Sequence, residues 1–282
     1  MKLTVDSGST KTDWGFFNNS YDLKTIKTQG INPCHQTIEE VNTIISSELL
    51  PNAKDLDLKS VKEVFYYGAG CATKSICSQM AGILREFFPN AAITVDSDML
   101  GAAHALCGHN YGIASILGTG ANSCLYDGRH IISNTPALGY ILGDEGSGGV
   151  LGKLFLHELY KGVLSEKIHS EFEREYGLTM ADVIQRVYRE PMPNRFLASL
   201  APFIHRHLSD EAVRQIVIRN FRDFFRYNIR PYGLSDIPVS FVGSIAFHFR
   251  GQLAEAAQAE GFRLGKILQS PIEGLVEYLI VR

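Results

Sequence analysis

Two short turns rich in glycine and hydroxyl side chains hold most of the chemistry that this sequence could perform. The first is Asp6-Ser-Gly-Ser-Thr-Lys-Thr-Asp13 and the second is Leu117-Gly-Thr-Gly-Ala-Asn122, and each follows an apolar segment of strand type. Glycine permits backbone conformations in which successive N–H groups point into one concavity, and neighbouring Ser and Thr hydroxyls add further donors. The pair therefore predicts a phosphate clamp divided between two turns.

A third apolar segment, Ala92-Ile-Thr-Val95, is followed by two carboxylates, Asp96 and Asp98. Phosphoryl transfer needs a group that positions the attacking hydroxyl and takes its proton, and it needs donors that offset the charge on the phosphate. A carboxylate and a divided phosphate clamp supply both, so the sequence predicts an ATP-dependent kinase. No segment has the G-x-x-x-x-G-K-[ST] pattern of a P-loop, which excludes that class of nucleotide site.

The composition is that of an ordinary globular protein. Of 282 residues, 45% are apolar and 20% charged, enough for one large or two medium domains, and we expect two. The 27 Lys and Arg residues nearly balance the 30 Asp and Glu residues and form no cationic block, so neither a nucleic-acid nor a membrane partner is expected. The chain shows no basic-then-apolar leader and no apolar stretch near the roughly 20 residues that cross a bilayer, and we expect a soluble protein.

The cysteines indicate a reducing environment. Their number is odd and they are widely scattered, at Cys34, Cys71, Cys77, Cys107 and Cys124. Such a set is typical of free thiols, so we expect a cytoplasmic protein. No CxxC pair and no HExxH motif occurs, and a structural zinc site is therefore not expected.

The first part of the chain has the pattern of an α/β unit. Strands are predicted at Leu3–Asp6, Asp13–Phe17, Leu23–Thr28, Val64–Tyr67 and Ala92–Val95, with Asn18-Asn19-Ser20 as a turn. Thr37 and Glu40 have the spacing of a capping box and are followed by apolar residues at helical spacing. Further helices are predicted over Ser75–Phe88 and directly after Asp98.

The second part begins in the same way, which suggests an internal duplication. Strands are predicted at Ile113–Leu117, Ser123–Tyr126 and Arg129–Ser133, and Asp127-Gly128 between the last two is typical of a type I′ hairpin turn. A mainly helical region follows over 146–230, with Asp210–Arg226 its clearest amphipathic stretch. The remaining predictions are a strand at Val239–Val242, a turn at Gly243-Ser244, a helix over Ile245–Glu260, a strand near Phe262–Leu268, and a helix that opens near Pro271.

The order of these motifs resembles a known superfamily. The motifs are Asp6-x-Gly8-Ser9-Thr10, Asp98, Gly118-Thr-Gly120, Gly143-Asp-Glu-Gly-Ser147 and Val242-Gly-Ser-Ile-Ala246. They are similar over nearly the whole chain to the sugar kinase, actin and chaperone ATPase superfamily, and within it to the N-acetylglucosamine kinase and BadF/BadG/BcrA/BcrD ATPase branch. The Gly-Asp-Glu-Gly-Ser segment close behind Gly-Thr-Gly is the most specific of these marks.

The resemblance implies an α/β fold of two ribonuclease-H-like, actin-like ATPase domains with an interdomain cleft for ATP and Mg²⁺. The N-terminal domain would comprise residues 1–108 with a C-terminal helix at about 269–282. The second would comprise residues 109–268 and contain a helical insert. Closure about a hinge would bring substrate and nucleotide together.

The same resemblance assigns the nucleotide residues. Gly8, Ser9 and Thr10 would hold the β- and γ-phosphates, with Lys11 near enough to act electrostatically, and Asp6 would orient Mg²⁺ through water. The family usually has two glycines after this aspartate, and this chain has Ser7 at the first of those places. The alternative, from turn chemistry alone, is an ordinary hairpin opening.

The second turn, Gly118, Thr119, Gly120 and Ala121, would meet the transferring phosphate. Gly243 and Ser244 would lie against adenine and ribose. A bend between strands and a turn used only for packing are the structural alternatives for these two segments.

Asp98 aligns with the family's general base, and it is preferred over Asp96, which would be a metal-side or structural carboxylate. As an alternative, Asp98 could only cap the helix that follows it, since Asp is a favoured N-cap.

The substrate residues implied by the resemblance are Asn32, Asn122, Gly139 and Asp144. Asp144 would bind sugar hydroxyls, and Asn32 and Asn122 would contact the amino sugar. Asp144 precedes a predicted helix and could instead serve as its cap, and Asn32-Pro33 is also an ordinary turn signal.

The resulting prediction is an amino-sugar kinase that phosphorylates a hydroxyl, the 6-hydroxyl first, of N-acetylglucosamine or a related sugar, and that forms a homodimer. The main alternative is a BadF-type ATPase activator, which would share an iron-sulfur cluster across a dimer axis through Cys71 and Cys77. A sugar sensor without catalytic activity is a third class, but the chain has no spare N-terminal DNA-binding segment.

Overall fold

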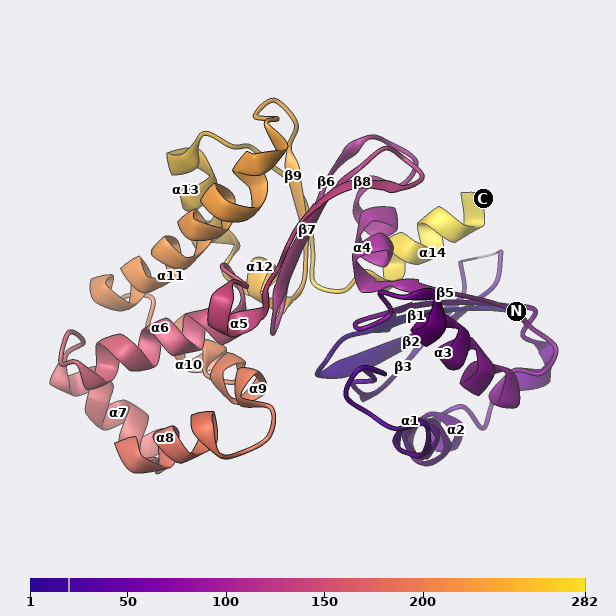
Figure 1. Ribbon diagram of the computed structural model, residues 1–282, viewed down its shortest axis with the longest axis horizontal. Coiled ribbons are helices and arrows are strands. Elements are labelled where there is room, and N and C mark those ends of the chain that lie inside the picture. Colours follow the sequence, from indigo (N-terminus) through magenta and orange to yellow (C-terminus); the bar gives the residue numbers. More distant parts are fainter. Residues whose placement is uncertain (20, 282) are drawn as a thin grey trace. The chain divides into compact units, whose positions relative to one another are not determined.

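The computed structural model describes residues 1–19 and 21–281 and contains two compact units. The first unit comprises Met1–Tyr111, Asp127–Ile131 and the C-terminal residues from Ser270, and the second comprises Gly112–Tyr126 and Ile132–Gln269. Each unit is built on a five-stranded sheet with helices beside it (Figure 1). The predicted turn Asn18-Asn19-Ser20 includes Ser20, which lies outside the described residues.

The sheet of the first unit is mixed. Its strands are β1 (Lys2–Ser7), β2 (Lys11–Phe17), β3 (Leu23–Gln29), β4 (Glu63–Gly68) and β5 (Ala92–Ser97). They lie in the order β3-β2-β1-β4-β5, with β3, β2 and β1 antiparallel and β1, β4 and β5 parallel. All the strands predicted for this part of the chain are confirmed. Each is one or two residues longer at one or both ends, because strand pairing continues into the neighbouring turn residues.

Helices cover both faces of this sheet (Figure 1). They are α1 (Ile38–Ile44), α2 (Leu50–Asn52), α3 (Lys74–Phe87), α4 (Asp98–Cys107) and α14 (Ile272–Val281). α4 and α14 pack on each other and on β1, whereas α1 and α3 bury their apolar residues on the opposite face. The capping box is confirmed: the Thr37 hydroxyl accepts from the Glu40 N–H, and the Glu40 carboxylate accepts from the Thr37 N–H.

The sheet of the second unit repeats the arrangement of the first. Its strands are β6 (Gly112–Leu117), β7 (Ala121–Tyr126), β8 (Ile131–Thr135), β9 (Val239–Val242) and β10 (Leu264–Leu268). The order β8-β7-β6-β9-β10 matches β3-β2-β1-β4-β5 strand for strand, and β6 is likewise antiparallel to β7 and parallel to β9. The predicted duplication is therefore confirmed.

Two local predictions in this part of the chain are wrong. The hairpin between β7 and β8 turns at Gly128 and Arg129, because Asp127 N–H bonds His130 O at 3.1 Å. Of the two central residues only Gly128 has a positive φ, 98°, whereas a type I′ turn needs a positive φ at both. The helix predicted over Ile245–Glu260 is divided into α12 (Ser244–His248) and α13 (Arg250–Glu260) at Phe249, where the backbone leaves the helical region and the side chain is buried in the core.

The chain between β8 and β9 is mainly helical. Its α-helices are α5 (Gly139–Leu142), α6 (Gly148–Tyr160), α7 (Glu166–Tyr176), α8 (Met180–Tyr188), α9 (Pro193–Ala198), α10 (Ala201–Arg206) and α11 (Glu211–Phe224). α11 packs on α6 and α13, and its Phe221 and Phe224 lie in the core of the unit. A π-helical turn, Phe225–Ile229, continues α11 directly.

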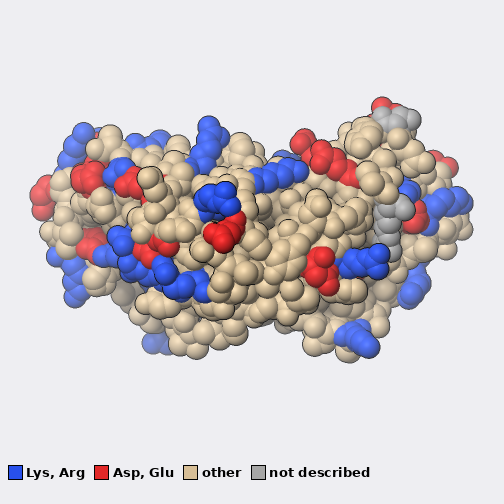
Figure 2. Space-filling model, turned by 90° about the horizontal axis from the view of Figure 1, so that it is seen from above, with Lys and Arg blue, Asp and Glu red and all other residues tan. Residues whose placement is uncertain are grey.

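The surface mixes charges of both signs. Lys and Arg side chains alternate with Asp and Glu side chains over the face drawn in Figure 2, and neither sign covers it. Within residues 1–19 and 21–281, every helix is too short or too polar to pass through a bilayer.

A buried hydrogen bond in the first unit offers a test of its stability. Trp14 is the single tryptophan of the chain, and its indole N–H donates to the Thr28 hydroxyl at 3.0 Å within the core. In Thr28→Val the shape is kept but the indole N–H loses its partner, so we expect the free energy of unfolding of this unit to fall by about 1–3 kcal/mol. Urea unfolding followed by tryptophan fluorescence measures this. Thr25→Val, on the exposed side of the same strand, is the matched control and should change stability by less than about 0.5 kcal/mol; equal losses would contradict the assignment.

Candidate active site

A hydrogen bond closes the first glycine turn, and the backbone after β3 packs against it. Gly8 N–H donates to Lys11 O at 2.9 Å between β1 and β2, and Gly30 N–H donates to Thr10 O at 3.1 Å. A Cβ on Gly30 would collide with the Gly8 carbonyl oxygen, so the backbone after β3 lies directly against the turn. Only glycine allows this approach. It holds the turn in one conformation, with Thr10 and Lys11 exposed.

Ser7 stands where the family that this chain resembles usually has the first of two glycines. Its side chain helps to hold the glycine turn in place. Its side chain is fully buried, and its hydroxyl donates to Ile31 O at 2.8 Å and bonds the Thr12 hydroxyl at 2.7 Å. The Thr12 hydroxyl in turn accepts from Ile31 N–H at 3.2 Å. The serine therefore fits this position because its hydroxyl ties both strands to the Gly30–Ile31 segment.

The structure brings Asp6, Lys11 and Asp98 together, and it adds Asp13 to them. Asp13 lies directly opposite Asp6 in the β1–β2 pair, and its Oδ2 accepts from Lys11 Nζ at 2.7 Å. Burial, and then the neighbouring carboxylates of Asp13 and Asp98, raise the pKa of Asp6 to about 7 against the effect of Lys11. Asp13 was not predicted as a site residue, because it is the first residue of a predicted strand. A carboxylate between Thr12 and Trp14 in an otherwise apolar strand was the available signal.

Asp98 is the first residue of α4 but not its cap. The Ser97 hydroxyl accepts from Leu100 N–H at 3.2 Å and is the N-cap, so the capping alternative for Asp98 is wrong. Asp98 Oδ1 accepts from Met99 N–H at 2.8 Å, which orients the carboxylate. Burial raises the pKa of Asp98, and the bond from Met99 opposes that rise. Asp96 lies elsewhere, in the lining of a cavity of about 630 Å³ with Tyr67 and His104.

Asn32 lies beside the turn at Gly70. Asn32 Oδ1 accepts from Cys34 N–H at 3.0 Å and Asn32 O accepts from His35 N–H at 3.0 Å, so the predicted turn is present. A Cβ on Gly70 would collide with Asn32 Oδ1, and Gly70 has a φ of 82°. The Asn32 side chain is therefore held against a position that only glycine can occupy without strain.

In the second unit, the turn between β6 and β7 is bound to the start of α6. The Gly118 and Thr119 carbonyl oxygens accept from Gly148 N–H at 2.8 Å and Gly149 N–H at 3.0 Å. A Cβ on Gly243 would collide with the Leu117 carbonyl oxygen, so the backbone after β9 also packs on this turn. The structure thus groups Gly118, Thr119 and Gly243, with Ser244 next in the chain.

Asp144 is the centre of a second group of predicted residues. It has a φ of 55°, unusual for a residue with a side chain, and the N–H groups of Ala121 and Gly139 stabilise its carboxylate. A Cβ on Gly120 would come within 3.0 Å of Asp144 Oδ2. Burial raises the pKa of Asp144 to about 6 against these hydrogen bonds. Ser147 caps α6, so the capping alternative for Asp144 is wrong.

Asn122 is held by its neighbours on the sheet. Its Oδ1 accepts from Asn134 Nδ2 at 2.9 Å and from Ser123 N–H at 2.9 Å. The side chain is therefore fixed at the edge of the turn, one residue beyond Ala121.

Two buried asparagines support the Gly143–Ser147 segment and were missed. Asn220 on α11 accepts from Gly146 N–H at 2.9 Å and donates to Ser147 O at 3.2 Å. Asn228, in the π-helical turn, donates to Glu145 Oε2 at 3.0 Å. An amide on the apolar face of an amphipathic helix was the signal that could have identified Asn220.

The donor set of the first unit fits a hard cation. Among residues 1–19 and 21–281, no group of three or more His, Cys, Asp or Glu side chains could hold a metal ion by itself. Mg²⁺ usually takes one or two carboxylates and completes its shell with phosphate oxygens and water. Asp13 Oδ1 is buried and has no hydrogen-bond partner among the described residues, so one carboxylate oxygen is available for such a role.

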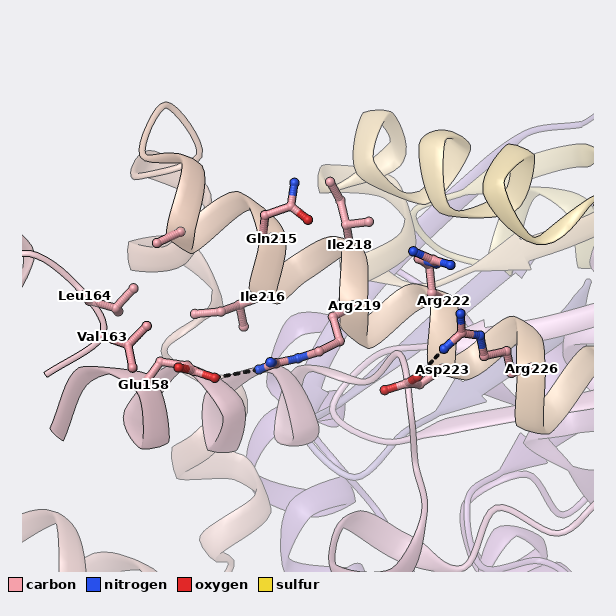
Figure 3. Close-up of a pocket in the computed structure, with 11 residues that line it drawn as sticks. Glu158, Val163, Leu164, Gln215, Ile216, Ile218, Arg219, Arg222, Asp223 and Arg226 are labelled. Carbon is pink, nitrogen blue, oxygen red and sulfur yellow. Dashed lines mark hydrogen bonds and ion pairs between the residues drawn. The ribbon is translucent and has the colours of Figure 1, made fainter. Parts of the chain in front are cut away.

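A further cavity lies between α6 and α11 in the second unit (Figure 3). It has a volume of about 400 Å³, and its arginines face carboxylates: Arg219 bonds Glu158 at 2.8 Å and Arg226 lies 3.7 Å from Asp223. None of the predicted site residues lines it. It is therefore separate from the residues grouped around Asp144.

Comparison with solved structures identifies the family. A provisionally assigned N-acetylglucosamine kinase from Porphyromonas gingivalis is 48% identical, with a TM-score of 0.97, over 100% of this chain and 99% of its own. The chain belongs to the N-acetylglucosamine kinase family. Membership of this family confirms the resemblance that its motifs indicated.

More distant structures share the fold of this family. A second provisionally assigned N-acetylglucosamine kinase, from Chromobacterium violaceum, is 17% identical with a TM-score of 0.74, over 100% of this chain and 98% of its own. A ROK family glucokinase from Streptomyces griseus, in complex with glucose and AMPPNP, is 15% identical with a TM-score of 0.58, over 98% of this chain and 97% of its own. No family model matches the chain, and no curated protein does.

The raised pKa of Asp6 predicts a gain in stability when its charge is removed. Its folded pKa of about 7 lies above the ordinary 3.8, so the proton on Asp6 favours folding below about pH 4 and this contribution is lost as the pH rises to about 7. Asp6→Asn cannot ionise. At pH 8, without nucleotide or metal, we expect it to be more stable than the natural protein by up to about 4 kcal/mol.

Urea unfolding between pH 4 and pH 8, followed by Trp14 fluorescence, tests this expectation. The difference between the two proteins should vanish near pH 4, which serves as the internal control. A variant that is less stable at pH 8, or a difference that does not change with pH, would contradict the electrostatic origin.

Proposed function

We propose that this protein is an amino-sugar kinase that transfers the γ-phosphate of ATP to a hydroxyl, the 6-hydroxyl first, of N-acetylglucosamine or a closely related sugar. Its family makes it an ATP-dependent carbohydrate kinase. The observation that carries the finer proposal is the Asp144 carboxylate, which lies against Gly120 and is stabilised by the N–H groups of Ala121 and Gly139. A fixed carboxylate beside a phosphate-type turn can accept hydrogen bonds from sugar hydroxyls while the phosphate is transferred next to it.

In the first unit, Gly8, Ser9 and Thr10 would hold the β- and γ-phosphates. Lys11 extends from the same turn, and its side chain is 49% exposed, so it can reach a bound anion. Asp6 would orient Mg²⁺ through water. When bound, that ion would neutralise charge on the phosphate oxygens.

Asp98 would be the general base. Its carboxylate accepts the proton of the sugar hydroxyl as the hydroxyl oxygen forms its bond to the γ-phosphorus and the bond to the β-phosphate oxygen breaks. A half-buried carboxylate with a raised pKa takes this proton more readily than a fully exposed one. The bond from Met99 N–H to Oδ1 limits the orientations of the carboxylate during transfer.

In the second unit, Gly118, Thr119, Gly120 and Ala121 would meet the transferring phosphate. Gly243 and Ser244 would lie against adenine and ribose. Both glycine turns must reach one nucleotide for transfer to occur, so we infer an interdomain cleft that closes about a hinge and excludes water.

Asn32, Asn122, Gly139 and Asp144 would bind the sugar, and the helical segment between β8 and β9 would be the insert that shapes its pocket. The domains would follow the sequence division, 1–108 with about 269–282 and 109–268. We also propose that the protein is a homodimer and that it is located in the cytoplasm.

The activator function is a second candidate because three thiols meet around Gly70. Cys34 Sγ donates to Gly70 O at 3.3 Å, and Cys77 Sγ donates to Cys71 O at 3.6 Å. However, five residues separate Cys71 from Cys77, which matches neither the C-x₂-C nor the C-x₄-C spacing of common cluster motifs. This disfavours an iron-sulfur site, and the kinase remains the better proposal.

A coupled assay of ADP release over a panel of hexoses and amino sugars tests the function. The proposal expects release that depends on the sugar and is fastest with N-acetylglucosamine or a near relative. Release without sugar, together with a brown chromophore under anaerobic conditions, would favour the activator. Sugar binding without any release would indicate a sensor.

The base assignment predicts a selective loss of turnover. Asp98→Asn keeps the shape of the side chain but cannot take the proton, so we expect kcat to fall by about 10²–10⁴-fold. Nucleotide affinity, measured by calorimetry, should change by less than about threefold. Asp96→Asn is the matched control two residues away and should keep kcat within about tenfold of the natural protein. Near-normal turnover in Asp98→Asn would show that another group is the base.

A further inference from the structure

Asp13 has no assigned part in the proposed reaction, yet its surroundings are those of a functional carboxylate. We propose that Asp13 supplies an oxygen ligand to the divalent cation that accompanies the nucleotide, directly opposite Asp6. This inference rests on the proposed function, because the cation would arrive with ATP. Asp6 would then act through water and Asp13 through a direct bond.

The pairing of the strands sets the two carboxylates on the same side of the sheet. Asp6 and Asp13 are direct partners in the antiparallel β1–β2 pair, and side chains in that relation lie about 5 Å apart at Cβ. Like charges directly opposite each other destabilise a sheet. A position of this kind inside a buried sheet therefore calls for a compensating cation.

The described charged groups around this pair leave an excess of negative charge. Asp6 interacts electrostatically with Asp13, Asp98 and Lys11. Three carboxylates against one ammonium give two negative charges when all are ionised, which is the charge that a divalent cation would neutralise. A cation bound here would also touch the phosphates held by residues 8–10 of the adjoining turn.

The two oxygens of Asp13 differ in their contacts. Oδ2 accepts from Lys11 Nζ at 2.7 Å and from the Ser270 hydroxyl at 3.1 Å. Oδ1 is buried and has no hydrogen-bond partner within the described residues, and the residue as a whole is 1% exposed. A buried carboxylate oxygen without a partner is costly, whereas a hard cation binds such an oxygen well.

Lys11 and Ser270 fix the direction of the unpartnered oxygen. Ser270 belongs to the segment that leads into α14, and Lys11 is the first residue of β2. Hydrogen bonds from two separate elements therefore hold the Asp13 carboxylate. Asp13 could instead serve only to position Lys11 for the phosphates. In that case its loss would weaken nucleotide binding, not cation binding, and the two roles can be separated by measurement.

Mn²⁺ is a suitable probe because it replaces Mg²⁺ at such sites and is observed directly by electron paramagnetic resonance. In the presence of saturating ADP, we expect Asp13→Asn to weaken Mn²⁺ binding by at least about tenfold. Its affinity for ADP without metal should stay within about twofold of the natural protein. Lys11→Met, which removes the cation on Oδ2 but keeps the carboxylate, is the matched control and should weaken ADP itself. Unchanged Mn²⁺ affinity in Asp13→Asn, or a loss pattern identical to that of Lys11→Met, would overturn the proposal.

A second measurement does not depend on the folding of Asp13→Asn. The natural protein labelled with ¹³C at its aspartate carboxylates should show a strong ¹³C coupling to Mn²⁺ in the ADP complex, because Asp13 would be bonded directly to the ion whereas Asp6 would act through water. Absence of that coupling would overturn the ligand assignment. If Mn²⁺ binding depends on Asp13 but ADP release does not depend on sugar, Asp13 is a metal ligand and the kinase function is rejected. Failure of the ligand assignment and failure of the proposed function are therefore distinguishable.

Discussion

The close grouping of three carboxylates, Asp13 buried and Asp6 and Asp98 half-buried, is the constraint on which the candidate active site depends. Asp6 and Asp13 face each other across β1 and β2, Asp98 begins α4 nearby, and Lys11 is the cation that faces them. Such an arrangement opposes folding, because each charge loses water and repels its neighbours. Lys11, the hydroxyl of Ser270 and the N-terminus of α4 offset part of this cost. The remaining negative charge is of the kind that a site for a cation and a phosphate requires.

The glycine turn is held in place by the same kind of contact in both units. In each, the turn between the first two strands rests on backbone that lacks a side chain, Gly30 in the first unit and Gly243 in the second. The close approach leaves no room for a Cβ at either position. The turns are therefore held by main-chain contact as well as by their own hydrogen bonds, which keeps donor groups in place before any ligand binds.

The second unit adds a polar network within an otherwise apolar core. α11 presents phenylalanines to the core, but its Asn220 holds the Gly146–Ser147 backbone, and Asn228 in the following π-helical turn holds Glu145. These bonds connect the helical segment to the Gly143–Ser147 motif. The residues that follow Asp144 are fixed in this way, and its own N–H donates to Ala137 O at 2.9 Å, so its left-handed conformation is held from both directions.

Local patterns along the chain predicted the helices and strands and the residue types of the site. The glycine turns, the Thr37 capping box and the repeated pattern of strand, glycine turn and strand depend on neighbours a few positions apart, so local pattern was sufficient to predict them. Which side chains meet depends on how distant segments pack. This packing set Asp13 opposite Asp6 through strand register, gave the cap of α4 to Ser97 instead of Asp98, divided the predicted helix at Phe249, and joined Asn220 to Gly146 across 74 positions of sequence. Contacts of this kind depend on packing between distant segments, and no local pattern encodes them.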